Sequence, residues 1–460
     1  MLVILGFLMV AAFMFLILTK RATPVVALIL VPVIFGLFAG AGLGIGDMIT
    51  DGIKSLAPTA ALLFFAIIFF GIMIDVGLFD PLVRGILRLV RNDPMKLVVG
   101  TAVLAMVVSL DGDGSTTFII VTSALLPLYL KLGVSPVILT VVAGLANGTM
   151  NIIPWGGPTV RAASALGISP SEVFVPMVPS LVAGLVIVLL FSVHLGLMER
   201  RRLGSLVFDQ EMVSVGGGGS DTGRPARRTG GGAGGDADGG AGQFIDGLDP
   251  QRDTLRPKLL WFNAALTVAL LVVLVMDILP IPVLFMIAAS IALTVNFPKV
   301  KEQGEAIARH SASIVSVVAM VLAAAVLTGV FSGTGMVEAM AEWLLGVIPS
   351  SMGPFLAVIT GVLSIPLTFF MTNDAFYFGI LPVLTETAAQ YGIEPVEMAR
   401  ASITGQPVHL QSPLVPAILL LVTLAGVSLA DHHKKVLWRA TVVSLAMLAV
   451  GVLLGQIPMG

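Results

Sequence analysis

Three aspartates stand in short polar breaks between long apolar runs. Asp111 and Asp113 are two residues apart in the sequence LDGDGSTT, and Asp374 follows Asn373 in the sequence TNDA. An aspartate at the centre of a bilayer costs about 2.5–3.5 kcal/mol on insertion scales, so it is rarely kept there without a role. Neighbouring carboxylates can bind a hard cation through oxygen or, being like charges, hold a proton on one of them. We therefore expect Asp111, Asp113 and Asp374 to carry metal or proton coupling; the alternative for each is a helix cap at a shallow tip.

Four polar breaks interrupt the apolar runs, at residues 111–117, 147–159, 372–374 and 406–413. Near mid-membrane each break would leave backbone groups unpaired and would restart a helix with its positive end toward the centre. Pro158 and Pro413 are helix-start signals, because a proline at the first helical position lacks only an N–H that has no partner there. Four converging helix ends would bind carboxylates without many arginines, unless the breaks are ordinary loops.

A few cationic and amide side chains accompany the breaks. Arg161 could form a forked pair with a substrate carboxylate, but it could equally neutralise a buried aspartate or extend to the outer surface. For Arg400 the structural role is favoured. His409 could contact a ligand, relay a proton or be a satisfied structural histidine. Neutral amides suited to hydroxyl and carboxylate contacts are Asn147, Asn151, Gln406 and Gln411.

The composition indicates the surroundings in which these residues act. Hydrophobic residues make up 57% of the 460 positions and charged residues only 11%, with a mean hydropathy of +1.03, whereas soluble proteins carry about 25% charged residues. Apolar runs long enough to cross about 30 Å of hydrocarbon recur along the chain. The lack of cysteine excludes disulfides and thiol chemistry. Residues 1–18 lack a basic start and a cleavage site, so we expect a retained transmembrane helix rather than a signal peptide.

A polar, glycine-rich segment divides the apolar sequence. It covers residues 205–257 and includes an unbroken run of glycines at 216–219. Such a composition cannot bury a core and predicts a flexible linker. We expect a first membrane repeat at residues 1–204 and a second at 258–460.

Both repeats show the same predicted order of elements: three helices, a hairpin, an interrupted helix and a final helix. The hairpins cover about 96–131 and 353–389, and the interrupted helices about 135–168 and 395–428. The arms of the first hairpin are short for a full crossing, which favours re-entrant hairpins whose irregular backbone faces protein or a watery cavity. The remaining helices are expected near 2–18, 23–45, 59–78, 173–197, 259–276, 279–296, 311–331 and 438–457.

The positive charges indicate how the repeats are oriented. Five crossings and one hairpin per repeat is an odd count, which inverts the second repeat. With the linker in the cytoplasm, the 25 Lys and Arg residues all fall on the cytoplasmic side except Lys54, Arg161 and Arg400, as the positive-inside rule requires. Inverted repeats with paired interrupted helices indicate a binding site near the midplane. We thus predict an all-α, multi-pass secondary transporter of the inner cell membrane, with Asp75 at the interface and the cluster at 431–435 as cytoplasmic loop charge.

Four segments carry a specific family resemblance: SLDGDGSTTFIIVTSALLPLY, NGTMNIIPWGGPTVRAA, FFMTNDAFYFGILPVL and GQPVHLQSPLVPA. They resemble the CitMHS family of citrate–divalent-metal/proton symporters, within the ion transporter superfamily. The resemblance covers both repeats but not the glycine-rich segment. It implies proton-driven uptake of citrate complexed with Mg²⁺ or Ca²⁺, no permanent cofactor, and a lipid-embedded homodimer of elevator-type protomers.

The resemblance also assigns contacts to the tips and breaks. Where sodium-coupled dicarboxylate relatives have Ser-Asn-Thr, the first tip has DGDGSTT, and its acidic residues suit protons or divalent metal better than sodium. Asp111, Asp113 and Asp374 are again the coupling candidates. Together with Arg161, the expected substrate contacts are Ser115, Thr116, Thr117, Asn147, Asn151, Gly157, Thr159, Thr372, Asn373, Gln406, His409 and Ser412.

Other functions are weighed against this one. A proton-coupled carrier of another di- or tricarboxylate would not depend on metal, and a cation/proton antiporter would exchange cations without citrate. An intramembrane aspartyl protease requires Gly-x-Gly-Asp, whereas the order here is Asp-Gly-Asp-Gly. A channel is disfavoured because inverted re-entrant pairs suit alternating access. We expect neither enzymatic activity nor a nucleic-acid partner.

Overall fold

The computed structural model describes residues 1–19, 21–90, 93–112, 114–214, 252–276, 278–349 and 351–459. Within these ranges the chain is helical and has no strand. Asp113 and most of the glycine-rich segment lie outside the described residues, so the predictions made for them stay predictions.

The part of the chain before the glycine-rich segment contains ten labelled helices among the described residues. They are α1 (Leu2–Leu18), α2 (Pro24–Phe38), α3 (Ile45–Asp75), α4 (Asp80–Val90), α5 (Pro94–Val108), α6 (Gly114–Lys131), α7 (Pro136–Met150), α8 (Gly157–Leu166), α9 (Pro170–Phe174) and α10 (Val178–Ser214).

The described residues after the glycine-rich segment form a second set of helices. Its helices are α12 (Leu260–Val275), α13 (Ile281–Asn296), α14 (Val300–Arg309), α15 (Ser311–Gly333), α16 (Met336–Val347), α17 (Leu356–Phe370), a π-helical turn (Ala375–Ile380), α18 (Leu381–Ala389), α19 (Pro395–Ser402), α20 (Gln406–His409), α21 (Pro416–Leu424) and α22 (Leu429–Leu453).

Eight helical segments of the described chain are long and apolar enough to cross a membrane. In the ranges predicted as hairpins the structure has α5 followed by α6 and α17 followed by α18, and α7 and α8 are separated by a short break. Local signals explain these boundaries. Asp93 caps α5 ahead of a proline, Gly112 turns the first hairpin with φ +80, and Gly156 precedes Pro158 at the start of α8.

Several boundary predictions were wrong. Helix α3 begins at Ile45 and continues through Pro58, rather than starting near residue 59. The amphipathic helices α4 and α14 and the helix α16 were not expected. In the second interrupted helix, residues 406–409 are helical and the restart is at Pro416, not Pro413. For α3, the polar residues 47–54 proved compatible with helix because this part of the helix packs closely against α15.

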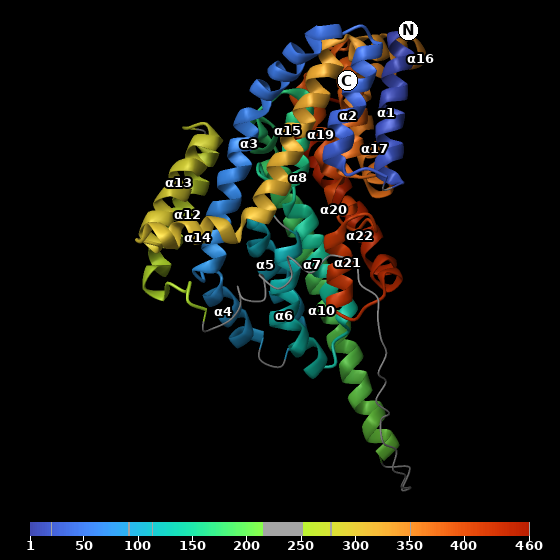
Figure 1. Cartoon of the computed structure of the whole chain (residues 1–460). Coiled ribbons are helices and arrows are strands. Elements are labelled where there is room, and N and C mark those ends of the chain that lie inside the picture. The colour runs from blue at the N-terminus through green and yellow to red at the C-terminus, as the bar shows by residue number, and fades with distance from the viewer. Residues whose placement is uncertain are drawn as a thin grey trace.

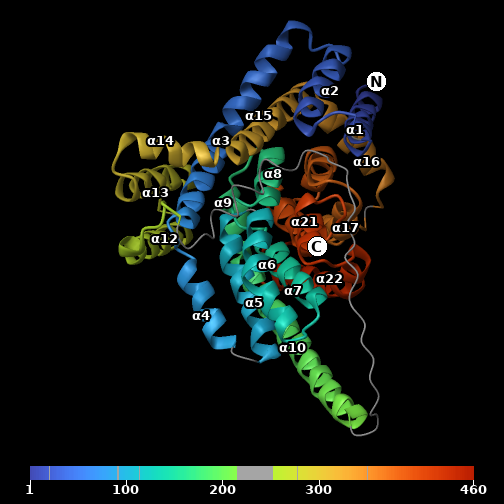
Figure 2. The same ribbon diagram turned by 60° about the horizontal axis from the view of Figure 1, so that its bottom comes forward.

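Two groups of helices enclose the centre of the molecule. In Figures 1 and 2, α12, α13 and α14 lie beside α3 at one edge, while α5, α6 and α7 lie next to the later helices α21 and α22. Helix α15 packs along α3 and also reaches α8. A Cβ added at Gly52 would lie 2.1 Å from the Ala325 carbonyl oxygen, and one at Gly329 would lie 2.2 Å from that of Met48. Helices α3 and α15 therefore cross in backbone contact, as small residues permit.

Four connections are named here by position. The first tip is residues 109–114 between α5 and α6, and the second tip is residues 371–374 after α17. The first break is residues 151–156 between α7 and α8, and the second break is residues 410–415 between α20 and α21.

Candidate functional site

A large cavity lies between the two helix groups. Its volume is about 910 Å³, within the range of about 300–1,000 Å³ usual for small-molecule sites. One part of its wall comes from α3 and α15, and another from the first tip and the start of α8. The polar residues lining this second part are Asp111, Ser115, Thr116, Arg161 and Ser164, together with the backbone of Gly157.

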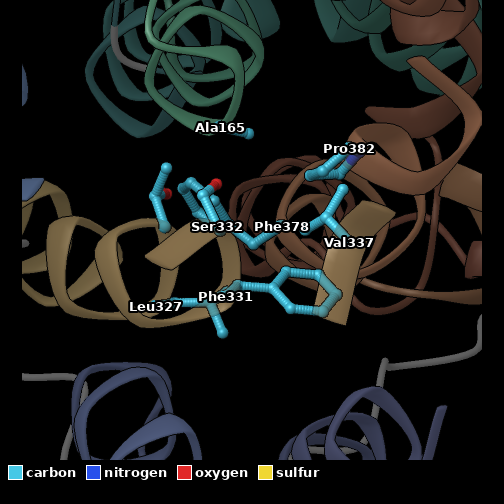
Figure 3. A pocket seen from close by; sticks show the side chains of 8 residues that line it. Ala165, Leu327, Phe331, Ser332, Val337, Phe378 and Pro382 are labelled. Atoms are coloured by element: carbon cyan, nitrogen blue, oxygen red, sulfur yellow. The ribbon is translucent and has the colours of Figure 1, made fainter. Parts of the chain in front are cut away.

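Figure 3 shows a second, much smaller pocket beneath Ala165, bordered by Phe331, Val337, Phe378 and Pro382. Its volume of about 10 Å³ is about the space of a single water molecule. A solute the size of an organic acid therefore fits only the larger cavity of the two.

Residues of α7 and of the first break hold the first tip in place. The Asn147 side chain donates from Nδ2 to Ser109 Oγ at 2.8 Å, and Ser109 Oγ lies 3.3 Å from Thr117 Oγ1. Trp155 donates from Nε1 to the Leu110 carbonyl oxygen at 2.8 Å. The bond from Trp155 satisfies a backbone carbonyl after the end of α5 that has no helical partner. Thr117 and Asn147 therefore support the tip from behind rather than line the cavity.

A chain of amides joins the two interrupted helices to the second tip. Asn151 Nδ2 lies 3.5 Å from Gln406 Oε1, and Gln406 Nε2 donates to Asn373 Oδ1 at 3.2 Å and to the Tyr377 hydroxyl at 2.9 Å. Thr372 accepts a hydrogen bond from the Ala375 backbone N–H at 3.2 Å. Gln406 of α20 thereby links the first break to the second tip.

Arg161 links α8 to the second tip. It donates from Nε to Asp374 Oδ1 at 2.6 Å and from a terminal nitrogen to the Gly157 carbonyl oxygen at 3.1 Å. The Asp374 side chain is 9% exposed and that of Arg161 is 26% exposed. Of the three roles considered for Arg161, the structure has it neutralising a buried aspartate while it also lines the cavity.

Comparison with known proteins identifies the family. The sequence profile of the family described as "Citrate transporter" (CitMHS) matches residues 13–405. The chain belongs to the citrate transporter family. A Bacillus subtilis protein named "Citrate transporter" is 47% identical over 99% of this chain and all of that protein. Another from the same organism, named "Mg(2+)/citrate complex secondary transporter", is 47% identical over 99% of both.

A solved structure agrees at the level of fold. The Alcanivorax borkumensis YdaH transporter superposes with a TM-score of 0.55 over 90% of this chain and 88% of that one, at 13% sequence identity. The family and the apolar helices together make this citrate transporter family member an integral membrane protein, and place it among transporters rather than enzymes.

Three predicted contacts of the transporter bond to backbone instead of lining the large cavity. His409 Nδ1 lies 2.5 Å from the Thr368 carbonyl oxygen, and Ser412 donates to that of Phe369 at 2.6 Å. Thr159 donates to the Ile152 carbonyl oxygen at 2.7 Å. The carbonyls at the end of α17 and near the first break need donors, since the helix ends there. Within the described chain, His409 and Ser412 therefore bond to the end of α17, and Thr159 bonds to the first break.

Arg400 also has a structural contact in the transporter. Its Nε and one terminal nitrogen donate to the Glu172 carbonyl oxygen at 3.2 and 2.9 Å. It thus ties α19 to α9, as the favoured interpretation of the sequence supposed.

The cluster at 431–435 was wrongly predicted as loop charge. Ser428 caps α22 by accepting from the Asp431 backbone N–H at 3.1 Å, and His432 is fully buried. Its Nε2 lies 3.0 Å from Gln411 Oε1 and its Nδ1 lies 3.1 Å from Thr140 Oγ1. The sequence signal was present: a serine three positions before an acidic residue marks a helix start.

Proposed function

We propose that this protein imports citrate as a complex with a divalent metal, Mg²⁺ or Ca²⁺, together with protons. The observation that carries the proposal is the wall of the large cavity. There the first turns of α6 and α8, represented by Ser115, Thr116 and Gly157, adjoin the carboxylate of Asp111. Helix N-termini attract carboxylates, and a carboxylate attracts a hard cation, so this wall offers partners for both components of a metal–citrate complex. The name of the 47% identical relative supports the same substrate.

Charge explains why a metal would travel with the acid. Fully ionised citrate carries three negative charges, and moving them into a membrane protein is costly. A bound divalent cation lowers that charge and presents a centre that prefers oxygen ligands. In our proposal citrate oxygens occupy the helix ends, while the metal lies near Asp111 and Asp113. The contacts among Asn151, Gln406 and Asn373 hold the first break, α20 and the second tip in fixed positions relative to one another.

For the proton we propose one of Asp111, Asp113 or Asp374 as carrier. Asp374 offers a direct link to the substrate, because its charge holds Arg161 by the 2.6 Å bond. Protonation of Asp374 would weaken that bond and leave the Arg161 guanidinium, which lines the cavity, to attract a citrate carboxylate. Proton uptake and substrate binding would then favour each other.

The architecture that we propose is a homodimer of elevator-type protomers in the inner membrane, each with two inverted repeats. The repeated order of hairpin, interrupted helix and long helix in both parts supports this arrangement, as does the fold likeness to another transporter. The segment 205–257 would lie on the cytoplasmic side.

The test is uptake of labelled citrate into proteoliposomes under an imposed inward proton gradient, with Mg²⁺, Ca²⁺ or EDTA. Uptake that needs both the gradient and a metal supports the proposal, and the metal series gives the preference. Equal uptake in EDTA would make a free tricarboxylate carrier the leading account. If folded protein moves no citrate, other organic acids and then citrate-independent cation exchange are to be assayed.

A further inference from the structure

The large cavity has a second charged region that the proposed substrate contacts do not use. Its members are Asp75 at the end of α3, Arg309 and His310 where α14 meets α15, and Arg252 just before α12. These residues are far apart in the sequence but line the same cavity as the first tip.

Arg309 is only partly satisfied at this position. Its Nε donates to Asp75 Oδ2 at 3.0 Å, and His310 Nε2 lies 3.2 Å from the same oxygen. The terminal nitrogen Nη2 of Arg309 is buried and has no hydrogen-bond partner among the described residues. Arginine usually binds carboxylates through two parallel N–H groups, and a buried unpaired N–H is unfavourable. The Nη2 N–H of Arg309 thus lacks an acceptor, in a side chain that lines the cavity.

The surrounding structure fixes this pair. Arg252 Nε and Thr254 Oγ1 each donate to the Asp75 carbonyl oxygen at 2.9 Å, and Arg252 also pairs with Asp80 at 3.1 Å. The His310 ring packs on Gly71, where an added Cβ would lie 2.7 Å from its atoms. The end of α3 and the α14–α15 junction are therefore held together from both sides.

The start of α15 adds further attraction for an anion. Ser313 and Ser316 line the cavity and are three positions apart, on one face of the helix. The 23-residue helix α15 begins at Ser311, so its positive end adjoins Arg309. A guanidinium edge, a helix N-terminus and hydroxyl donors together recognise a carboxylate.

We propose that Arg309, with His310 and Ser313, forms a second carboxylate-binding site in the transport cavity, next to residues 252–254 and separate from the first tip. It binds a carboxylate of the transported organic acid on its way to or from the first tip. This inference rests on the proposed function. The cavity volume of about 910 Å³ leaves room for it, because drug-sized ligands, which exceed citrate, use about 300–1,000 Å³.

The test compares Arg309→Gln with Arg309→Lys and with the control Lys301→Gln. Lys301 lies on the same helix α14, is exposed and pairs only with Glu305 at 3.8 Å among the described residues. Citrate counterflow in proteoliposomes of known orientation gives an apparent KM for each face. For Arg309→Gln we expect a rise of roughly tenfold at one face, the usual loss for a charge-assisted hydrogen bond, and a change below about twofold at the other. Arg309→Lys should be intermediate and Lys301→Gln unchanged. Equal KM values for all variants, or equal rises at both faces, would overturn the site.

A charge-neutral double variant, Asp75→Asn with Arg309→Gln, separates binding from helix anchoring. If Arg309 only neutralises Asp75, the double variant regains the wild-type KM, and the proposal fails. If Arg309 binds substrate, the raised KM persists although the variant folds as well as the wild type.

Failure of the proposed function is distinguishable from failure of this site. If the wild-type protein moves no citrate, the same variants are compared by thermal shift in detergent with mono-, di- and tricarboxylates. A shift that depends on Arg309 supports a carboxylate site, and shifts that are equal in Arg309→Gln and wild type, or absent from both, overturn it.

Discussion

Arg161 and Asp374 are joined by a 2.6 Å hydrogen bond between Nε and Oδ1, although they are 213 positions apart in the chain. One follows the first break and the other forms the second tip, so the bond links the two membrane parts beside the large cavity. Nothing in the spacing of the sequence predicts this particular pair. It requires that α8 pack against the π-helical turn that follows the second tip, which it does.

Removing one partner of the Arg161–Asp374 pair should lower the free energy of unfolding, whereas removing both partners should restore most of it. Loss of one partner from a fully buried pair costs about 3–5 kcal/mol; with Arg161 26% exposed we expect about 1–3 kcal/mol for Asp374→Asn. The double variant Arg161→Gln with Asp374→Asn should recover most of the loss in thermal unfolding in detergent, yet stay defective in citrate uptake. Full transport by the double variant would contradict a functional role for the pair.

Proton coupling should depend on at least one aspartate at the tips. We expect Asp111→Asn, Asp113→Asn or Asp374→Asn to abolish the stimulation of uptake by a proton gradient, because an amide cannot carry the proton. Asp51→Asn is the matched control, since Asp51 is 72% exposed and pairs with Lys54 away from the cavity. Stimulation measured in proteoliposomes should be unchanged in the control. If all three test variants keep full coupling, the carrier lies elsewhere.

The sequence predicted local features better than long-range ones. The range of about 96–131, predicted as a hairpin, contains α5 and α6, whose limits are marked locally by a capping aspartate, a proline and glycines. The start of α3 was missed, since Lys54, Asp51 and Asp47 made residues 45–58 resemble a loop. Those charges lie on a helix that extends beyond its apolar portion.

The role of each site residue was less predictable because partners came from distant segments. Asp75, which was expected at the membrane interface, binds Arg309, 234 positions later, a partner that the sequence did not predict. His409 was a candidate ligand contact, but its Nδ1 lies 2.5 Å from the Thr368 carbonyl oxygen at the end of α17. Pattern analysis finds where backbone groups lack partners, whereas only the packed structure says which side chain satisfies them.

The α3–α15 crossing predicts a large effect from one added methyl group. Gly52→Ala would place Cβ 2.1 Å from a backbone oxygen that cannot rotate away, so the helices must separate. We expect a loss of about 1–3 kcal/mol, seen as a lower Tm in detergent. Gly46→Ala, on the same helix but with no atom within 4 Å of the added Cβ, should be neutral or slightly stabilising. Equal Tm values for the two variants would rule out this close crossing.

Trp155 should control the position of the first tip through its indole N–H. Trp155→Phe keeps an aromatic ring against Phe70 and Phe285, whose centroids lie 5.1 and 5.0 Å away, but loses the bond to the Leu110 carbonyl oxygen. A hydrogen bond of this kind contributes about 0.5–1.5 kcal/mol, so we expect the KM for citrate to rise by roughly two- to tenfold. Trp261→Phe, at a position that is 84% exposed, is the control. An unchanged KM would show that the tip does not depend on this bond.

His432 should stabilise the second break although it lies outside the cavity. Its ring nitrogens contact Gln411 and Thr140, and Gln411 donates in turn to the Gly144 carbonyl oxygen at 3.1 Å, so the imidazole ties α22 to α7 through the break. His432→Leu would leave the Gln411 side-chain oxygen buried without its donor, at a cost of about 1–3 kcal/mol. We expect a lower Tm in detergent, whereas His432→Gln, which can still donate to Gln411, should lose less. If both variants unfold at the wild-type temperature, the histidine is dispensable for the break and α22 is held by its apolar contacts alone.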